Sequence, residues 1–211
     1  MKTQQCNIVE HGQMSGLHCK TRRNTYSLVG LLILASVMAV ALIGMKANAA
    51  DEQNPYTQNM PAPELVGSHW INTPNSQPIR LADRKGKVTI VHFWTFGCIN
   101  CKRNLPAYNR WAKELASKDV AIIGVHTPET AGEGNLANVR AAVRHDGITY
   151  PILVDSDHKN WSRWNQQFWP TIYLIDKHGN IRYRWEGELE YDNQDGARKI
   201  TDLIETLRRE K

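Results

Sequence analysis

The feature that most constrains the fold is an apolar run followed at once by two closely spaced cysteines and a helical pattern. Residues 88–94, VTIVHFW, are β-branched and aromatic and come after the turn-like RKGK, which predicts a buried strand. Cys98 and Cys101 follow with the spacing C-x-x-C, and apolar residues three and four apart over 100–117 predict a helix. The cysteines are therefore expected on a strand-to-helix turn.

Strand and helix patterns alternate through the rest of the chain, which then ends in a hairpin and a helix. Apolar runs predict further strands at 120–125, 152–154, 171–176 and 181–187, and amphipathic patterns predict helices at 135–145, 159–168 and 196–209. A parallel start with a hairpin finish predicts an α/β fold with a mixed central sheet and helices on both faces. We also expect a small N-terminal hairpin formed by residues 69–72 and 78–81.

The first fifty residues have the composition of a targeting segment. Residues 26–45 form a segment of twenty residues without a charge, which is long enough to span a bilayer. A basic cluster precedes this segment. The A-x-A pattern at 47–49 suits a signal peptidase, so a cleaved signal peptide and an uncleaved anchor both remain open. The expected organisation is a cytoplasmic n-region (1–25), a signal or anchor (26–49), a polar tether (50–64) and a folded domain (65–211).

This organisation places the folded domain in the periplasm or another extracytoplasmic space, with membrane contact only through residues 26–45.

The net charge of +5 does not indicate nucleic-acid binding, because the first 49 residues carry five basic residues and one acid. The remainder carries 21 basic and 20 acidic residues and is nearly neutral. We therefore expect no nucleic-acid partner.

Four cysteines are present, but only Cys98 and Cys101 follow the apolar run. A structural zinc site needs four ligands, and no second cysteine pair or H-x₃₋₅-H pair comes later in the chain. Haem attachment needs C-x-x-C-H, whereas Lys102 follows here. A disulfide across two residues constrains the unfolded chain little. Dithiol–disulfide chemistry remains, with no metal and no organic cofactor.

The position on the turn assigns a role to each sulfur. Unpaired N–H groups and the helix dipole stabilise a thiolate at Cys98, which lowers its pKa and makes it the nucleophile. Cys101 lies one turn further in, within reach of a mixed disulfide at Cys98, and is expected to resolve it. Of the two, Cys98 should be the more exposed.

Three stretches together resemble the thioredoxin-like superfamily, in its TlpA-like or redoxin branch. They are FWTFGCINCKRNLP, VHTPE at 125–129 and FWPTIYLID at 168–176, and the combination is similar to the thioredoxin-like domain of DipZ-type and NHL-repeat-associated proteins. The resemblance implies a thioredoxin-like fold and a thiol–disulfide oxidoreductase that acts on protein clients, more as a reductant than as an oxidant. It also implies that Pro170 is a cis-proline facing the disulfide, and that a separate membrane electron donor supplies reducing equivalents.

The same resemblance raises a question about His92, which stands where thioredoxins keep a buried aspartate. It is either a proton acceptor for Cys101 or a core histidine satisfied by hydrogen bonds.

The sheet order gathers further candidates at the edge that carries Cys98. Trp94, Phe96 and Trp169 are candidates for apolar walls of a client groove, and the alternative for the tryptophans is a role in core packing. His126 and Glu129 either tune the thiol pKa or form a solvated pair without that effect.

Two other functions stay open. Thr95 and Cys98 match the T-x-x-C part of a peroxiredoxin pattern, although Val91 replaces its proline and a partner cysteine follows three residues on. A non-catalytic client-binding module with a tryptophan-rich surface is the second alternative.

Overall fold

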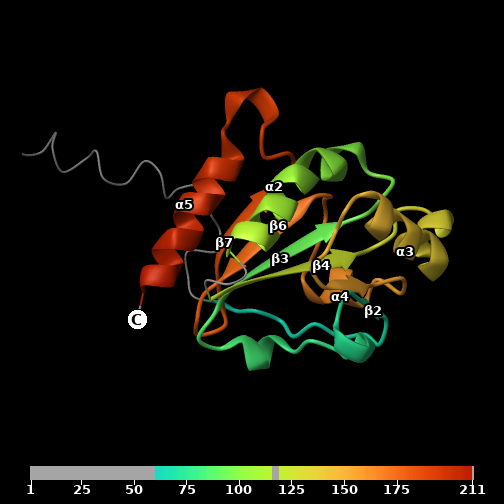
Figure 1. Ribbon diagram of the computed structural model, residues 1–211, viewed down its shortest axis with the longest axis horizontal. Helices are drawn as coiled ribbons and strands as arrows, with labels where there is room; N and C mark the ends of the chain where they lie inside the picture. Colours follow the sequence, from blue (N-terminus) through green and yellow to red (C-terminus); the bar gives the residue numbers. More distant parts are fainter. Residues whose placement is uncertain (1–59, 116–118, 211) are drawn as a thin grey trace, which may run out of the picture. The chain divides into compact units, whose positions relative to one another are not determined.

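The computed structural model describes residues 60–115 and 119–210 (Figure 1). The predicted cytoplasmic region, the signal or anchor and most of the tether lie outside these residues. Within the part of the chain that is described, no helix combines the length and the apolar character that crossing a membrane requires.

A seven-stranded mixed sheet forms the centre of the domain, in the order β1-β7-β6-β3-β4-β5-β2. The neighbouring strands β3, β4 and β5 are parallel, whereas β6, β7 and both edge strands pair antiparallel to their neighbours. The strands are β1 (Met60–Pro61), β2 (Trp70–Ile71), β3 (Val88–Trp94), β4 (Val120–His126), β5 (Ile152–Val154), β6 (Thr171–Ile175) and β7 (Asn180–Glu186). All seven residues of β3 are buried, as expected for the central strand of a sheet covered on both faces.

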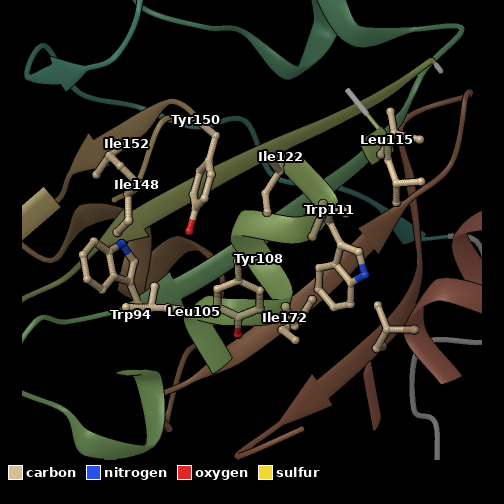
Figure 2. Packing of buried hydrophobic residues seen from close by; sticks show 14 of the residues in the cluster. Trp94, Leu105, Tyr108, Trp111, Leu115, Ile122, Ile148, Tyr150, Ile152 and Ile172 are labelled. Carbon is tan, nitrogen blue, oxygen red and sulfur yellow. The ribbon is translucent and has the colours of Figure 1, made fainter. Parts of the chain in front are cut away.

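One face of the sheet carries the long helices (Figure 1). They are α2 (Ile99–Leu115), α3 (Leu136–His145) and α5 (Gly196–Arg209). The α2 helix continues through Pro106, and Asn135 caps α3 by accepting hydrogen bonds from the backbone of its first turn. Between this face and α2 lies an aromatic layer that contains Trp94, Tyr108 and Trp111 (Figure 2).

The other face is covered mainly by an N-terminal segment rather than by long helices. Residues 62–69, here called the strap, connect β1 at one edge of the sheet to β2 at the opposite edge. The nine residue steps from Pro61 to Trp70 span about 30 Å when extended, which is about six inter-strand spacings, so the strap is close to fully extended. Leu65 and Trp70 pack on this face, together with the short helix α4 (Lys159–Arg163) and its neighbour Trp164.

The small N-terminal hairpin expected from residues 69–72 and 78–81 is wrong. Residues Trp70–Ile71 pair with Leu153 and Ile152 of β5 instead, and residues 81–84 form a 3₁₀ helix. Burial decides the pairing, since Trp70 is 1% exposed and its indole nitrogen donates to the Gly67 carbonyl. Positive φ at Asn72, the last residue of the first expected strand, and at Asn75 and Ser76, which follow it, redirects the chain.

The strand register determines what meets at the active-site edge. Trp94 pairs with His126 at the ends of β3 and β4, and Phe93 pairs with Thr171 at the start of β6. The residues that follow β3 and β4, and those that precede β6, therefore gather at one edge of the sheet. The predicted meeting of the Cys98 turn, the 126–129 segment and Trp169–Pro170 is confirmed.

Candidate active site

The two cysteines stand where β3 gives way to α2. Cys98 is half-buried and immediately precedes the first residue of α2, whereas Cys101 is fully buried in the first turn. The Cys101 backbone N–H donates to the Cys98 sulfur at 3.3 Å, and both sulfurs are free thiols. The expectation that Cys98 is the more accessible of the pair is confirmed.

The surroundings separate the acidities of the two thiols. A hydrogen bond from the Cys101 thiol lowers the pKa of Cys98 to about 7, against smaller opposing effects of burial and of the Glu129 carboxylate. Burial raises the pKa of Cys101, and the hydrogen bond with Cys98 raises it further. Near neutral pH, a large fraction of Cys98 is therefore thiolate, whereas Cys101 keeps a proton that the thiolate can share.

Thr95 connects this pair to a second set of polar groups. Its carbonyl accepts from the Cys98 N–H at 3.3 Å, and a backbone hydrogen bond from Thr95 acts on the Cys101 sulfur. The buried Thr95 hydroxyl donates to the carboxylate of Glu133, and its oxygen lies 3.3 Å from Nε2 of His126.

Glu133 is the functional candidate that sequence reasoning missed. It lies in a 3₁₀ turn, Ala131–Gly134, and is buried although it is charged. Burial acts to raise the pKa of Glu133, but hydrogen bonds from the Thr95 hydroxyl, the Glu129 amide and Thr130 outweigh that effect and hold the pKa below its ordinary value. In the sequence, ETAGEG reads as an exposed polar loop, and no local pattern distinguishes this glutamate from Glu129.

His126 and Glu129 do not form a solvated pair. His126 is buried at the end of β4, its ring is stacked on Phe96 with 5.4 Å between centroids, and burial lowers its pKa to about 4. The Phe96 amide nitrogen lies 3.4 Å from Nε2 of His126. Glu129 is exposed, and its carboxylate acts to raise the pKa of Cys98. His126 therefore packs against the Cys98 turn from the protein interior, whereas Glu129 affects the pKa of Cys98 from the surface.

Trp169 and Pro170 reach the same edge from the other side. Their peptide bond is cis, as the resemblance implied. The Trp169 indole donates to the Thr127 carbonyl at 3.1 Å and is stacked on Trp161, with 3.9 Å between ring centroids. Trp169 thus links the segment after β4 to the segment before β6, and its half-buried ring leaves only part of its surface for a client.

Trp94 is not a wall of a client groove. It is fully buried among the α2-facing aromatic residues, because the alternation along β3 directs it inward (Figure 2). Exposed apolar side chains occur instead at Ile99, directly after Cys98, at 60%, and at Phe168, directly before Trp169, at 51%. Their sequence neighbours, Cys98 and Trp169, were predicted as site residues. The exposure of Ile99 and Phe168 could not be predicted from the sequence pattern.

His92 lies in the core, but it is not satisfied by hydrogen bonds. Its ring is 4.2 Å from the Tyr108 ring and 5.5 Å from the Tyr150 ring, measured between centroids. Neither ring nitrogen finds a hydrogen-bond partner among the described residues. Burial lowers the pKa of His92 to about 3, so the imidazole is neutral.

Within residues 60–115 and 119–210, no group of three or more histidine, cysteine or acidic side chains is arranged to hold a metal ion.

Comparison with known proteins agrees with this geometry. Residues 58–184 match the AhpC/TSA family. The chain is 40% identical over 132 residues to protein DipZ of Mycobacterium bovis, a match that covers 62% of this chain but only 19% of DipZ. It is 28% identical over 124 residues to the thiol-disulfide oxidoreductase YkuV of Bacillus subtilis, covering 58% of this chain and 81% of that protein.

The fold has solved counterparts. A crystal structure of a thioredoxin-like superfamily protein aligns with a TM-score of 0.64 at 24% identity, over 72% of this chain and 98% of the other. The expected thioredoxin-like fold, and the resemblance to the DipZ-type domain, are thereby confirmed.

Proposed function

The chain belongs to the AhpC/TSA family, within the thioredoxin-like redoxins, and from this premise we propose that it exchanges disulfides with protein clients through Cys98 and Cys101. One observation carries the proposal. A half-buried thiol with a pKa of about 7 lies beside a buried thiol whose pKa is raised, so attack and resolution fall to different sulfurs.

The reaction balances within the pair and the client. The Cys98 thiolate attacks a client disulfide, which forms a mixed disulfide and releases one client thiolate that takes up a proton. Cys101 then gives up its proton and attacks the Cys98 sulfur, which releases the second client thiol. The protein ends with a Cys98–Cys101 disulfide and the client with two thiols. A separate dithiol donor, which we place in the membrane, must then reduce the pair.

The direction of electron flow belongs to the same proposal. We assign the protein to the reductants, acting outside the cytoplasmic membrane after export through residues 26–49. A reduction potential of about −270 mV suits a reductant of the thioredoxin kind, whereas one of about −120 mV indicates a strong oxidant. Alkaline phosphatase fused after Lys211 and expressed in a bacterium reports the location, because it gains activity only outside the cytoplasm.

Thiol peroxidase is the rival within the family. In that chemistry the threonine of T-x-x-C would assist at the reactive sulfur. Here the single hydroxyl proton of Thr95 is committed to Glu133, and the resolving partner of Cys98 already lies one helical turn away. The contact between the two thiols therefore favours exchange over peroxide reduction.

The deciding experiment compares three proteins on two substrates. Wild type, Cys98→Ala and Cys101→Ala are assayed for insulin reduction with dithiothreitol and for hydrogen peroxide consumption. We expect turnover of insulin by wild type only, and mixed disulfides trapped on Cys101→Ala but not on Cys98→Ala.

Three outcomes contradict this function. Peroxide consumption without insulin turnover identifies a peroxidase. Client binding that is unaffected by both substitutions identifies a non-catalytic binding module. Equal trapping by the two variants shows that the roles assigned to Cys98 and Cys101 are wrong.

A further inference from the structure

Glu133 lies on the underside of the active-site turn, which is here defined as Thr95 to Cys98. One carboxylate oxygen accepts both the Thr95 hydroxyl and, at 2.9 Å, the Glu129 N–H. The other oxygen lies so close to Gly97 that a β-carbon added there would be only 2.2 Å from it. Gly97 has no unusual φ, so the absence of a side chain matters for space rather than for conformation.

Thr95 transmits this contact to both sulfurs. Its side chain is held by Glu133, while its backbone bonds to the Cys98 N–H and to the Cys101 sulfur. A fully buried hydroxyl without a partner is costly, so Thr95 keeps this position only while an acceptor is present. The hydroxyl proton goes to Glu133, in a turn 38 residues further along the chain, whereas Nε2 of His126, 3.3 Å from the same hydroxyl oxygen, also faces the Phe96 N–H.

We propose that Glu133 is a positioning residue for disulfide exchange, which acts through Thr95 to hold the Cys98 turn at the geometry where the two sulfurs share a proton. This inference rests on the proposed function and adds to it a residue that does not touch the client. Oriented support of this kind determines how well a reactive group is presented, even though the supporting group takes no part in bond making.

Other charged and titratable groups also face the pair and must be separated from Glu133 in any test. Glu129 acts directly on Cys98 as a charge, Tyr108 lies near both sulfurs on the α2 side, and His126 is neutral. Substitution of Glu133 by glutamine distinguishes position from charge. Glutamine keeps an oxygen that can accept from both Thr95 and the Glu129 amide, but it carries no charge.

The experiment measures the rate of Cys98 alkylation by iodoacetamide between pH 5 and 9, in the full-length protein. We expect Glu133→Ala and Thr95→Val to raise the midpoint of the pH profile by about one unit, because the thiol–thiolate hydrogen bond is the largest cause of the lowered Cys98 pKa. Glu133→Gln and Thr95→Ser should keep the midpoint close to that of wild type, because glutamine keeps an acceptor oxygen and serine keeps the donating hydroxyl.

Glu64 supplies a matched control. Its carboxylate also accepts backbone N–H groups, from Leu65, Leu81 and Ala82, but it lies on the strap. Glu64→Ala should lower the denaturation midpoint and leave the alkylation profile unchanged. A general loss of stability would move both variants alike, so a shift in Glu133→Ala alone identifies positioning.

Two results would overturn the proposal, and neither is confused with failure of the proposed function. An unchanged profile in both Glu133→Ala and Thr95→Val removes the positioning role even if wild type reduces insulin. A glutamine variant that shifts as far as alanine shows that charge and not position is responsible. Absence of insulin turnover by wild type refutes the proposed function, and the alkylation profiles still test Glu133.

Discussion

Two buried histidines lie on neighbouring strands of the same sheet, and only one of them contacts the active-site turn. His92 in β3 and His126 in β4 are both fully buried, and burial lowers the pKa of His92 to about 3 and that of His126 to about 4. His126 lies against the Thr95 hydroxyl and the Phe96 ring, whereas the His92 ring lies among the aromatic rings of Trp94, Tyr108 and Tyr150. Burial and pKa are nearly the same at the two positions, so the neighbours decide which one can affect the sulfurs.

A glycine allows close approach in each region. A β-carbon on Gly97 would meet the Glu133 carboxylate at 2.2 Å, beside the region of His126. A β-carbon on Gly124 would meet Ile152 at 2.5 Å and Nε2 of His92 at 2.9 Å. Adding one methyl group at each position therefore perturbs the two regions in a matched way.

The largest effect on catalysis is expected at Gly97. Gly97→Ala should slow insulin reduction about tenfold, because displacing a packed group costs about 1–3 kcal/mol and 1.4 kcal/mol corresponds to a factor of ten. In a Glu133→Ala background the same substitution should cost less than about twofold, since the colliding carboxylate is gone. Equal losses in both backgrounds would show that Gly97 is needed for another reason.

The matched change at Gly124 should act on stability. Gly124→Ala is expected to lower the free energy of unfolding by about 2 kcal/mol, through overpacking against Ile152 and His92. Urea denaturation measures this loss. The pH profile of Cys98 alkylation should stay where it is in wild type, and a shifted profile would connect the His92 region to the sulfurs and end the contrast.

The stability of the fold should decrease in acid, because the fold holds His92 in its neutral form. The folded pKa of His92, about 3, lies below the unfolded value near 6.5, so the unfolded chain binds the additional proton between these limits. The free energy of unfolding is therefore unaffected by protonation of His92 above about pH 6.5. It falls by about 1.4 kcal/mol per pH unit as the pH drops from there towards 3.

Replacement by leucine isolates that contribution. His92→Leu removes the titrating group, so its stability should fall less steeply with acid than that of wild type. Urea midpoints at pH 7, 6 and 5 provide the measurement. Identical slopes for the two proteins would mean that His92 is protonated without being penalised by burial.

The smallest expected effect is on catalysis. His92→Leu should leave insulin turnover within about twofold of wild type, because the ring has no hydrogen-bonded route to either sulfur among the described residues. A large fall in the resolution step, seen as an accumulating mixed disulfide, would instead support His92 as the proton acceptor for Cys101.

Local patterns predicted the part of the site that depends on chain order. The strand, turn and helix around Cys98 follow from periodicity, and the meeting of that turn with Trp169 follows from sheet topology. The inward direction of Trp94 follows from the alternation of β3 and agrees with the alternative that the tryptophans near the disulfide are core residues.

Long-range contacts could not be predicted from the sequence. Glu133 reaches Thr95 only because the 3₁₀ turn folds under the active-site turn, and no periodicity records that approach. The pairing of Trp70 with β5 was missed for a similar reason. An extended segment of eight residues between two very short strands carries no pattern that indicates which edge of the sheet it reaches.

The pairing of β1 also determines how this domain can be handled. Pro61 pairs with Asn180 at the beginning of β7, whereas the other end of β7 pairs Glu186 with Thr171, next to the edge that carries the cysteines. The last turn of α5 lies at the first of these ends, where Lys177 donates to the carbonyls of Arg208 and Glu210. Both ends of the described chain thus leave the domain opposite the sulfurs, so an affinity tag, a fluorophore or a solid support attached at either end leaves the route to Cys98 unobstructed.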